Sequence, residues 1–293
     1  MTRQYAILEA PSVLGLRPTG VERLPEALLR AGLDVQVRAR RVGRVEPPPY
    51  DDCRDPETLM LNPQGIADYT PTLANAIGQI LDTGDFPIVL GGDCSIVLGS
   101  LLALRRRGRY GLLYVDGHTD FYQPEANTNG EAASSDLALA TGRGPRMMTT
   151  FEGYRPLVQD TDVVVLGFRD AEEAARYGSQ VPPPEMRAID LREIRRSGVD
   201  AAADEAVDRL SRPELNGFWI HLDADALDDA VMPAVDYRFP DGLSWRELHV
   251  ILHAALNSPR AVGLEVTIFN PALDADGTIA RSLVEALVRS FSA

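Results

Sequence analysis

The sequence predicts an α/β fold in which a parallel sheet is covered by helices on both faces. Apolar runs that end in polar residues recur along the chain, as in Asp85–Gly92, Thr161–Phe168 and Phe218–Asp225. Continuous apolar runs of this length are typical of strands buried on both faces. Segments with helical spacing of apolar residues separate several of these runs, which is the alternation expected of parallel strands joined by helices.

The predicted elements follow one another from end to end. In chain order they are helices at 21–33 and 71–84, a strand at 85–92, a helix at 94–108, strands at 109–117, 161–168 and 218–225, a helix at 244–257, a strand at 260–271 and a helix at 278–291. The proline-rich segments 44–57 and 180–186 are predicted to be surface loops. Neither a linker nor a repeat of 20 to 50 residues interrupts the pattern, so we expect residues 1–293 to form a single domain.

Composition excludes several classes of protein. The chain has 293 residues, of which 45% are hydrophobic, and a net charge of −14. This acidity argues against a nucleic-acid partner, and the one dense basic run, Leu104–Arg109, suits the end of a helix. Neither a signal peptide nor a long apolar run is evident, and the two cysteines, Cys53 and Cys94, fit a reducing compartment. We therefore expect a cytoplasmic protein without a membrane partner.

Polar residues gather where the predicted strands end. The residues concerned are Asp93 and Cys94, then Asp116, His118 and Asp120, then Asp223, Asp225 and Asp228. Residues two apart in an extended chain point to the same side, so alternate carboxylates repel one another unless a cation lies between them. Each acid alone could instead cap a helix or bind loop amides. Together with an imidazole they indicate Mn²⁺ or a similar divalent ion, and bridging carboxylates suit two ions.

Four motifs carry a family resemblance. In this order and spacing, "GGDCS", "DGHTD", "HLDADALDD" and the "NP" of "FNPALD" resemble the ureohydrolases, the family of arginase, agmatinase and formiminoglutamase. The motifs extend from Gly91 to Asp274. The resemblance implies a three-layer α/β/α domain with a mainly parallel sheet of about eight strands. It also implies a pair of Mn²⁺ ions in each subunit and a homo-oligomer, either a trimer or a hexamer.

The resemblance assigns the metal ligands residue by residue. It implies that Asp116 and Asp223 bridge the ions, that His118 and Asp225 complete one site, and that Asp120 belongs to the other. The sixth position, normally histidine, is Cys94. A thiolate ligand there would shift the preference of that site towards Zn²⁺ or Fe²⁺. The alternative is a packed thiol beside a single metal ion.

The activity implied by the resemblance is hydrolysis of a C–N bond in a guanidino or amidine compound. A hydroxide bridging the two ions would attack the planar carbon, with Asp120 as the catalytic residue that holds it, and release urea or a urea-like product and an amine. Arginine, N-hydroxyarginine, agmatine and guanidino acids are candidates, and a cysteine at the position of Cys94 also resembles ureohydrolases that act on N-hydroxylated arginine. The alternative is a catalytically silent metal-binding protein with a regulatory or assembly role.

Two departures from the family pattern concern substrate recognition. Ala133 stands where arginases carry a proton-shuttle histidine, and Ile268 stands where the family has an acid that pairs with the guanidinium. Loss of that acid weakens binding of a cation, which places arginine itself in doubt. Glu131 could serve as proton shuttle or substrate anchor, or could be an exposed loop acid. Glu265 could face the cleft or pair with an arginine.

Further candidates for substrate binding come from the loops. Asp236 and Arg238 could bind substrate at the mouth of the site, with a surface ion pair as the alternative for Arg238. By alignment with arginases, Asn129 and Glu172 could hold an amino-acid head group, or they could cap helices. The remaining histidines, His221, His249 and His253, match no ligand position and are predicted to be structural.

Overall fold

The sheet is the framework on which the rest of the chain is arranged. The computed structural model describes residues 3–292, and its strands form one parallel sheet with the order β2-β1-β3-β8-β7-β4-β5-β6. The strands are β1 Tyr5–Ala10, β2 Arg40–Arg44, β3 Phe86–Gly91, β4 Gly111–Val115, β5 Val163–Leu166, β6 Arg187–Ile189, β7 Phe218–Asp223 and β8 Ala261–Thr267. The predicted α/β class with a parallel, eight-stranded sheet is therefore confirmed.

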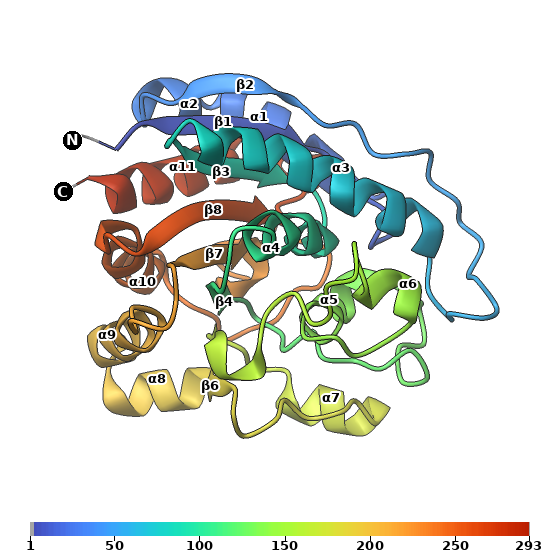
Figure 1. Cartoon of the computed structure of the whole chain (residues 1–293). Coiled ribbons are helices and arrows are strands. Elements are labelled where there is room, and N and C mark those ends of the chain that lie inside the picture. Colours follow the sequence, from blue (N-terminus) through green and yellow to red (C-terminus); the bar gives the residue numbers. More distant parts are fainter. Residues whose placement is uncertain (1–2, 293) are drawn as a thin grey trace.

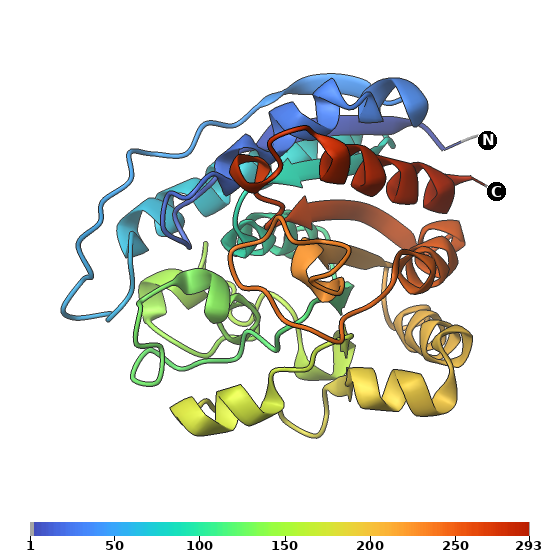
Figure 2. The same cartoon turned by 180° about the vertical axis from the view of Figure 1, so that it is seen from behind.

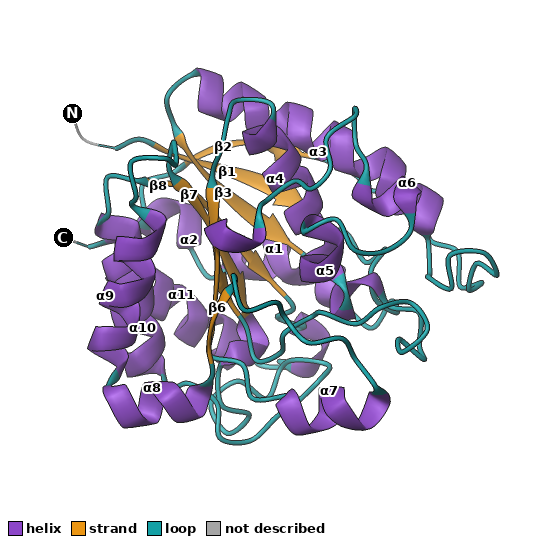
Figure 3. Ribbon diagram, turned by 60° about the horizontal axis from the view of Figure 1, so that its bottom comes forward, coloured by secondary structure: helices purple, strands orange, loops and turns teal. Residues whose placement is uncertain are grey.

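Helices cover both faces of the sheet (Figure 1). They are α1 Leu24–Arg30, α2 Leu33–Gln36, α3 Pro63–Asp82, α4 Val97–Arg105, α5 Asp136–Ala140, α6 Arg146–Thr149, α7 Ala171–Tyr177, α8 Leu191–Ser197, α9 Val199–Leu210, α10 Trp245–Asn257 and α11 Thr278–Phe291. Figure 2, seen from behind, shows α11 in front of the sheet, and Figure 3 shows the sheet between α10 and α11 on one side and α3 and α4 on the other. The result is a three-layer sandwich.

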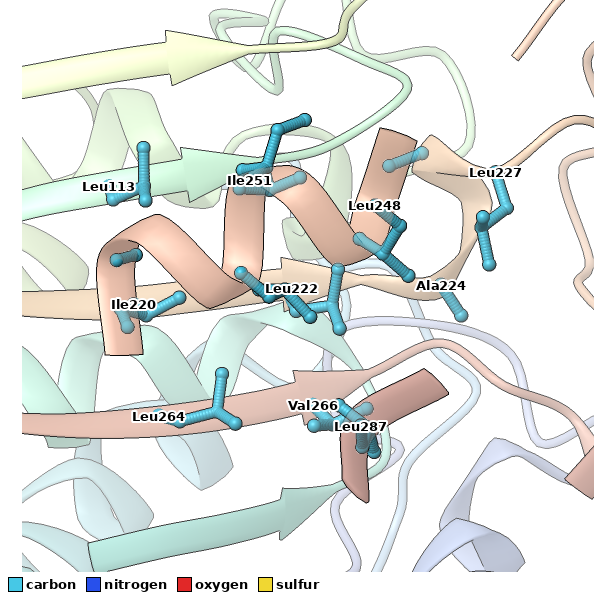
Figure 4. Packing of buried hydrophobic residues seen from close by; sticks show 14 of the residues in the cluster. Leu113, Ile220, Leu222, Ala224, Leu227, Leu248, Ile251, Leu264, Val266 and Leu287 are labelled. Atoms are coloured by element: carbon cyan, nitrogen blue, oxygen red, sulfur yellow. The ribbon is translucent and has the colours of Figure 1, made fainter. Parts of the chain in front are cut away.

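Alternation along the central strands separates two cores. In β7, Ile220 and Leu222 pack with Leu248 and Ile251 of α10 on one face (Figure 4). Trp219 points to the opposite face, towards the core built by α3 and α4. His221 and Asp223 follow Trp219 at intervals of two residues, so they lie on that same face. The alternation thus places two polar residues over the α4 side of the sheet.

Close packing at the centre of the sheet gives the first prediction. Gly263 of β8 pairs with Trp219 of β7, and a Cβ atom at Gly263 would lie 1.9 Å from Trp219 Cζ3. Gly263→Ala is expected to lower the free energy of unfolding by about 2 kcal/mol, because the buried indole has no room to move. Urea denaturation measures this. Gly65→Ala in α3 is the control, since its Cβ would meet Leu14 at 3.4 Å, and a loss as large in this variant would refute the packing argument.

Candidate metal centre and active-site cleft

The polar residues meet at the carboxyl edge of the four central strands. Cys94 begins a short 3-10 turn, Cys94–Ile96, three residues after the end of β3, and Asp116 directly follows β4. Asp223 ends β7, and Asp225 lies in the 3-10 turn Ala224–Ala226. Ligand crevices in open α/β sheets lie at this edge, because the loops that follow neighbouring strands converge there.

Loop amides use only some of the carboxylate oxygens. Asp223 accepts a hydrogen bond from the amide of Asp225 at 2.7 Å, and Asp116 Oδ1 accepts one from the amide of His118 at 2.6 Å. The alternative interpretation, in which the acids bind loop amides, therefore accounts for one carboxylate oxygen of Asp223 and one of Asp116. Asp116 Oδ2, however, is buried without a hydrogen-bond partner among residues 3–292. An unpartnered buried carboxylate oxygen is costly unless a cation binds it.

Two groups of potential metal ligands share Asp116. Asp116, His118 and Asp225 form the first group, and Cys94, Asp116, His221 and Asp223 form the second. Within each group one ligand atom from every residue lies within 4.8 Å of the others. The sharing of Asp116 is the arrangement expected of a carboxylate that bridges two ions. The donors, which are mainly carboxylates with imidazole and a thiol, fit divalent cations such as Mn²⁺, Fe²⁺ and Zn²⁺.

The electrostatics of the first group show how strongly it attracts positive charge. His118 Nδ1 lies 3.1 Å from Asp225 Oδ2. Burial alone would lower the pKa of His118, but the carboxylates of Asp225 and Asp116 outweigh burial and raise the pKa well above its usual value. The neighbouring carboxylates thus favour the protonated form of His118 in the protein without metal. A bound cation would supply that positive charge instead and leave the imidazole neutral.

Cys94 belongs to the apolar core, but its sulfur lies beside polar groups of the site. Its Sγ atom is 2.9 Å from Asp223 Oδ2 and 3.1 Å from Thr267 Oγ1. Burial, followed by the charge of Asp223, raises the pKa of the Cys94 thiol well above its usual value. Without metal the thiol therefore donates a hydrogen bond to Asp223. Its contact with a candidate ligand places the sulfur where a metal ion bound by Asp223 would meet it.

Asp120 stands slightly apart from the two groups. Its backbone has a φ of 43°, in the left-handed region, and its Oδ2 atom accepts a hydrogen bond from the Tyr114 hydroxyl at 2.7 Å. The same hydroxyl lies 2.8 Å from Asp136 Oδ1. Burial and the charge of Asp116 raise the pKa of Asp120 well above its usual value. Tyr114 therefore fixes the orientation of a carboxyl group that faces the site.

A cleft of ≈ 160 Å³ opens above these residues. Its walls combine the candidate ligands with aromatic, amide and small side chains: Leu16, Cys94, His118, Asp120, Tyr122, Ala126, Asn127, Thr128, Asn129, Ala133, Ser134, Glu173, Tyr177, Asp223, Asp225, Tyr237 and Ile268. This volume suits part of a small molecule, and a polar mouth above a cluster of acids suits a substrate that carries a basic group.

The structure brings Glu131 into contact with Asn129 of the cleft wall, although Glu131 itself is not part of the lining. Asn129 lines the cleft, and Asn129 Nδ2 donates a hydrogen bond to Glu131 Oε2 at 2.8 Å. Glu131 also accepts a hydrogen bond from the Tyr237 hydroxyl. Only 3% of Glu131 is exposed, so the interpretation of Glu131 as an exposed loop acid is wrong. Burial raises the pKa of Glu131 above its usual value.

Three other predicted substrate-binding residues lie outside the lining of the cleft. Glu172 is exposed and pairs with Arg192 at 3.0 Å, whereas its neighbour Glu173 lines the cleft. Successive residues of a helix point about 100° apart, so an alignment error of one position is enough to exchange them. This geometry does not support a contact between Glu172 and substrate.

Asp236 and Arg238 are occupied by protein partners. Asp236 accepts hydrogen bonds from Thr19 Oγ1 at 2.5 Å and from Asn270 Nδ2 at 2.7 Å. Arg238 pairs with Asp229 at 3.2 Å, which is the surface ion pair weighed as the alternative to a carboxylate clamp. Tyr237, between them in the chain, is the residue that reaches the cleft. Sequence reasoning missed it because a single tyrosine in a loop carries no spacing signal.

Comparisons with known proteins agree with this geometry. The family model described as "Arginase family" matches residues 3–293. The chain belongs to the arginase family, and it is therefore a metal-dependent amidinohydrolase by family. The predicted resemblance is confirmed at the level of the family, while a ligand role for Cys94 stays a prediction.

Two curated arginases and one solved structure illustrate the relationship. The arginase of Brevibacillus brevis is 28% identical over 302 positions that cover 99% of this chain and 98% of the relative. The arginase of Bacillus subtilis strain 168 is 28% identical, with 99% and 98% covered. The structure of the arginase from Bacillus caldovelox superposes with a TM-score of 0.88 at 25% identity and covers 100% of this chain and 99% of its own. The similarity therefore extends over nearly the whole chain.

Proposed function

We propose that this protein hydrolyses a C–N bond of a small guanidino or amidine compound and releases urea or a urea-like product and an amine. The observation that supports this proposal is the pair of ligand groups that share Asp116 at the floor of the cleft. We further propose two Mn²⁺ ions per subunit, a cytoplasmic location and a homo-oligomer. Within residues 3–292, no helix is long and apolar enough to cross a membrane.

The donor set fits the metal ions of the family. Asp116, His118 and Asp225 would hold one ion, and Cys94 and Asp223 would contribute to the other. When bound, such ions lower the pKa of water towards neutrality and so supply a nucleophile. The orphaned Asp116 Oδ2 is the structural observation that supports this fit.

The protein's own side chains orient the substrate and handle protons. Asp120, held by Tyr114, presents a carboxyl group to the floor of the cleft. Asn129 and Tyr237 can donate or accept hydrogen bonds at its wall, and both are held in place by the buried Glu131. Asn129 and Tyr237 lie in loops, so their hydrogen bonds to Glu131 are what limits the cost of ordering them around a bound substrate.

The apolar Ile268 affects which guanidino compound binds best. Ile268 lines the cleft with a backbone φ of 70° and offers no carboxylate to pair with a guanidinium. A fully charged guanidinium therefore binds with lower affinity here than in a site with a pairing acid. N-hydroxylation makes a guanidine less basic, so the missing acid is expected to reduce the affinity for N-hydroxyarginine less than the affinity for arginine. We therefore expect a preference for N-hydroxyarginine over arginine.

The test is product release by Mn²⁺-loaded protein. Arginine, N-hydroxyarginine, agmatine and a series of guanidino acids are incubated with the enzyme, and urea, hydroxyurea and the amine are quantified by mass spectrometry. Stoichiometric urea-type product and amine support the proposal. Tight binding of two Mn²⁺ ions without product from any of these compounds would instead indicate a catalytically silent relative with a regulatory or assembly role.

Glu131 gives a prediction on pH dependence. Glu131→Gln is expected to lower kcat/KM by about 10²-fold if the carboxylate takes part in proton transfer. Because burial raises its pKa, Glu131 ionises at higher pH than an exposed glutamate, so the acid limb of the wild-type pH profile should lie above the usual range for glutamate. That limb should vanish in the variant. A variant with reduced activity but an unchanged pH profile would show that Glu131 only supports Asn129 and Tyr237.

A further inference from the structure

A row of buried polar side chains runs across three strands, one step below the candidate ligands. Tyr114 of β4 pairs in register with His221 of β7, and His221 pairs with Glu265 of β8. Two residues further along, on the same face, Asp223 pairs with Thr267. His221 therefore lies directly beneath the edge that carries Asp223 and Cys94. All three members of the lower row are fully buried.

Contacts with Tyr114 and Glu265 fix the ring of His221. Its plane stacks on Tyr114, with ring centroids 4.4 Å apart and an angle of 5° between the planes. Nδ1 lies 2.7 Å from Glu265 Oε1, and the other oxygen of Glu265 accepts a hydrogen bond from Ser100 Oγ at 2.5 Å. Since the Glu265 carboxylate is the acceptor for both neighbours, Nδ1 carries the proton. In the neutral ring Nε2 then carries a lone pair.

That lone pair has no hydrogen-bond partner among the residues that the structure describes. Nε2 of His221 is buried without a hydrogen-bond partner in the described part of the chain, as is Asp116 Oδ2. A ring nitrogen of His221 belongs to the group in which ligand atoms of Cys94, Asp116 and Asp223 lie within 4.8 Å of one another. Nδ1 is already engaged with Glu265, so Nε2 is the nitrogen available to this group. Burying such an acceptor without a partner is destabilising, and a bound cation would remove that cost.

We propose that His221 Nε2 is a ligand of the metal ion held by Cys94 and Asp223, with Glu265 as the positioning residue behind it. This inference rests on the metal centre of the proposed function. A carboxylate that accepts the Nδ1 proton while Nε2 binds metal is the usual way in which proteins orient a metal-binding histidine. The second site thus has thiolate, imidazole and carboxylate donors, a mixed set that favours Zn²⁺, Co²⁺ or Fe²⁺ over Mn²⁺ more than carboxylates and imidazole alone would.

A competing explanation uses the same contacts. His221 could be protonated on both nitrogens and form an ion pair with Glu265, so that the imidazolium itself supplies positive charge to the cluster. The two explanations predict opposite effects of removing the ring. Loss of a ligand weakens metal binding, whereas loss of a competing cation leaves metal binding unchanged or strengthens it.

The experiment is a Co²⁺ titration of the metal-free protein, followed by calorimetry and by the thiolate-to-cobalt absorption band. The wild-type protein should bind two ions and show the band. His221→Asn keeps a donor near the Nδ1 position for Glu265 but removes Nε2. Glu265→Gln tests the positioning role, and His253→Gln, on the partly exposed face of α10, is the matched control.

His221→Asn should weaken the Co²⁺ site that shows the band by at least about 10²-fold, and Glu265→Gln should weaken it by about 10-fold. The other ion should bind as before, and His253→Gln should match the wild type. Wild-type affinity and an unchanged band in His221→Asn overturn the proposal, and so does tighter binding. These readouts do not depend on turnover, so a protein that binds Co²⁺ through His221 but releases no urea-type product contradicts the proposed function alone.

Folding of the variant is checked by circular dichroism and by melting in chelator. If His221→Asn does not fold, the wild-type protein labelled with ¹⁵N provides the second measurement. Addition of Zn²⁺ should shift the His221 Nε2 resonance far more than the Nδ1 resonance. Equal or absent shifts on saturation with Zn²⁺ overturn the proposal.

Discussion

Asp116→Asn is expected to abolish hydrolysis while the fold is retained. Asp116 is fully buried and belongs to both ligand groups, so its replacement removes negative charge from both metal sites at once. The amide of Asn can still accept the hydrogen bond from the His118 amide through its carbonyl oxygen. We expect kcat/KM to fall by at least about 10³-fold, because loss of even one electrostatic group at a reacting centre costs about 10²–10³-fold.

The measurement is steady-state product release with the best substrate, accompanied by calorimetric titration of Mn²⁺. Asp204→Asn is the matched control, since Asp204 is an exposed acid on α9 and the same charge is removed far from the cleft. The control should keep wild-type activity and bind two ions. Activity in Asp116→Asn within about 10-fold of wild type would show that the shared carboxylate does not bridge the ions on which turnover depends.

Strands and helices with strong apolar patterns were predictable, and those governed by their surroundings were not. The central strands β3, β4, β7 and β8 lie within the predicted segments because both of their faces are buried. Strand β2, Arg40–Arg44, has mostly exposed charged side chains and forms the edge of the sheet, so no apolar run marks it. The three-residue strand β6 is likewise too short to show an apolar run.

Helix α3 extends further than its sequence pattern indicates. The sequence predicts a helix over residues 71–84, beginning at Pro71. The helix begins eight residues earlier, at Pro63, and Pro71 lies inside it. The buried side chains of Ile66 and Tyr69 in its first turns pack into the same core as Leu73 and Ile77. Tertiary packing thus extends the helix across a residue that locally disfavours it.

The site was predictable where its residues are close in sequence and not where they meet across strands. Spacing of two within a motif places Asp223 and Asp225, or Asp116 and His118, at one edge without knowledge of the rest of the fold. His221 became informative only through its partner Glu265, which is 44 residues away in the chain. The sequence left two interpretations of Glu265 open, a residue that faces the cleft or the partner of an arginine. In the structure its carboxylate contacts the buried His221 and Ser100 instead.

The second large effect concerns stability without metal. In chelator, the melting temperature is expected to fall as the pH rises above the usual pKa of aspartate. Burial, and then repulsion by neighbouring carboxylates, raises the pKa of Asp120 and of Asp223 well above the usual value. The folded protein then holds protons that the unfolded chain has released, so stability is lost as the pH rises through the raised pKa values.

Bound metal should reverse this dependence. A divalent cation replaces those protons, so its binding strengthens as the pH rises, and each ion at 100-fold excess over its Kd adds about 2.7 kcal/mol to the free energy of unfolding. The gain in melting temperature on adding Mn²⁺ should therefore be larger at about pH 8 than at about pH 6. Calorimetric melts at matched ionic strength measure both curves.

Asp223→Asn separates charge repulsion from a general loss of packing. Asn fills the same space and can still accept the hydrogen bond from the Asp225 amide, but it removes one buried negative charge. In chelator at about pH 8 the variant should melt at a higher temperature than the wild type, and with saturating Mn²⁺ it should melt at a lower one. A variant that is less stable under both conditions would show that Asp223 contributes through its contacts with Cys94 and the Asp225 amide. A variant that melts above the wild type without metal and below it with metal is expected only if the charge of Asp223 destabilises the metal-free fold and contributes to metal binding.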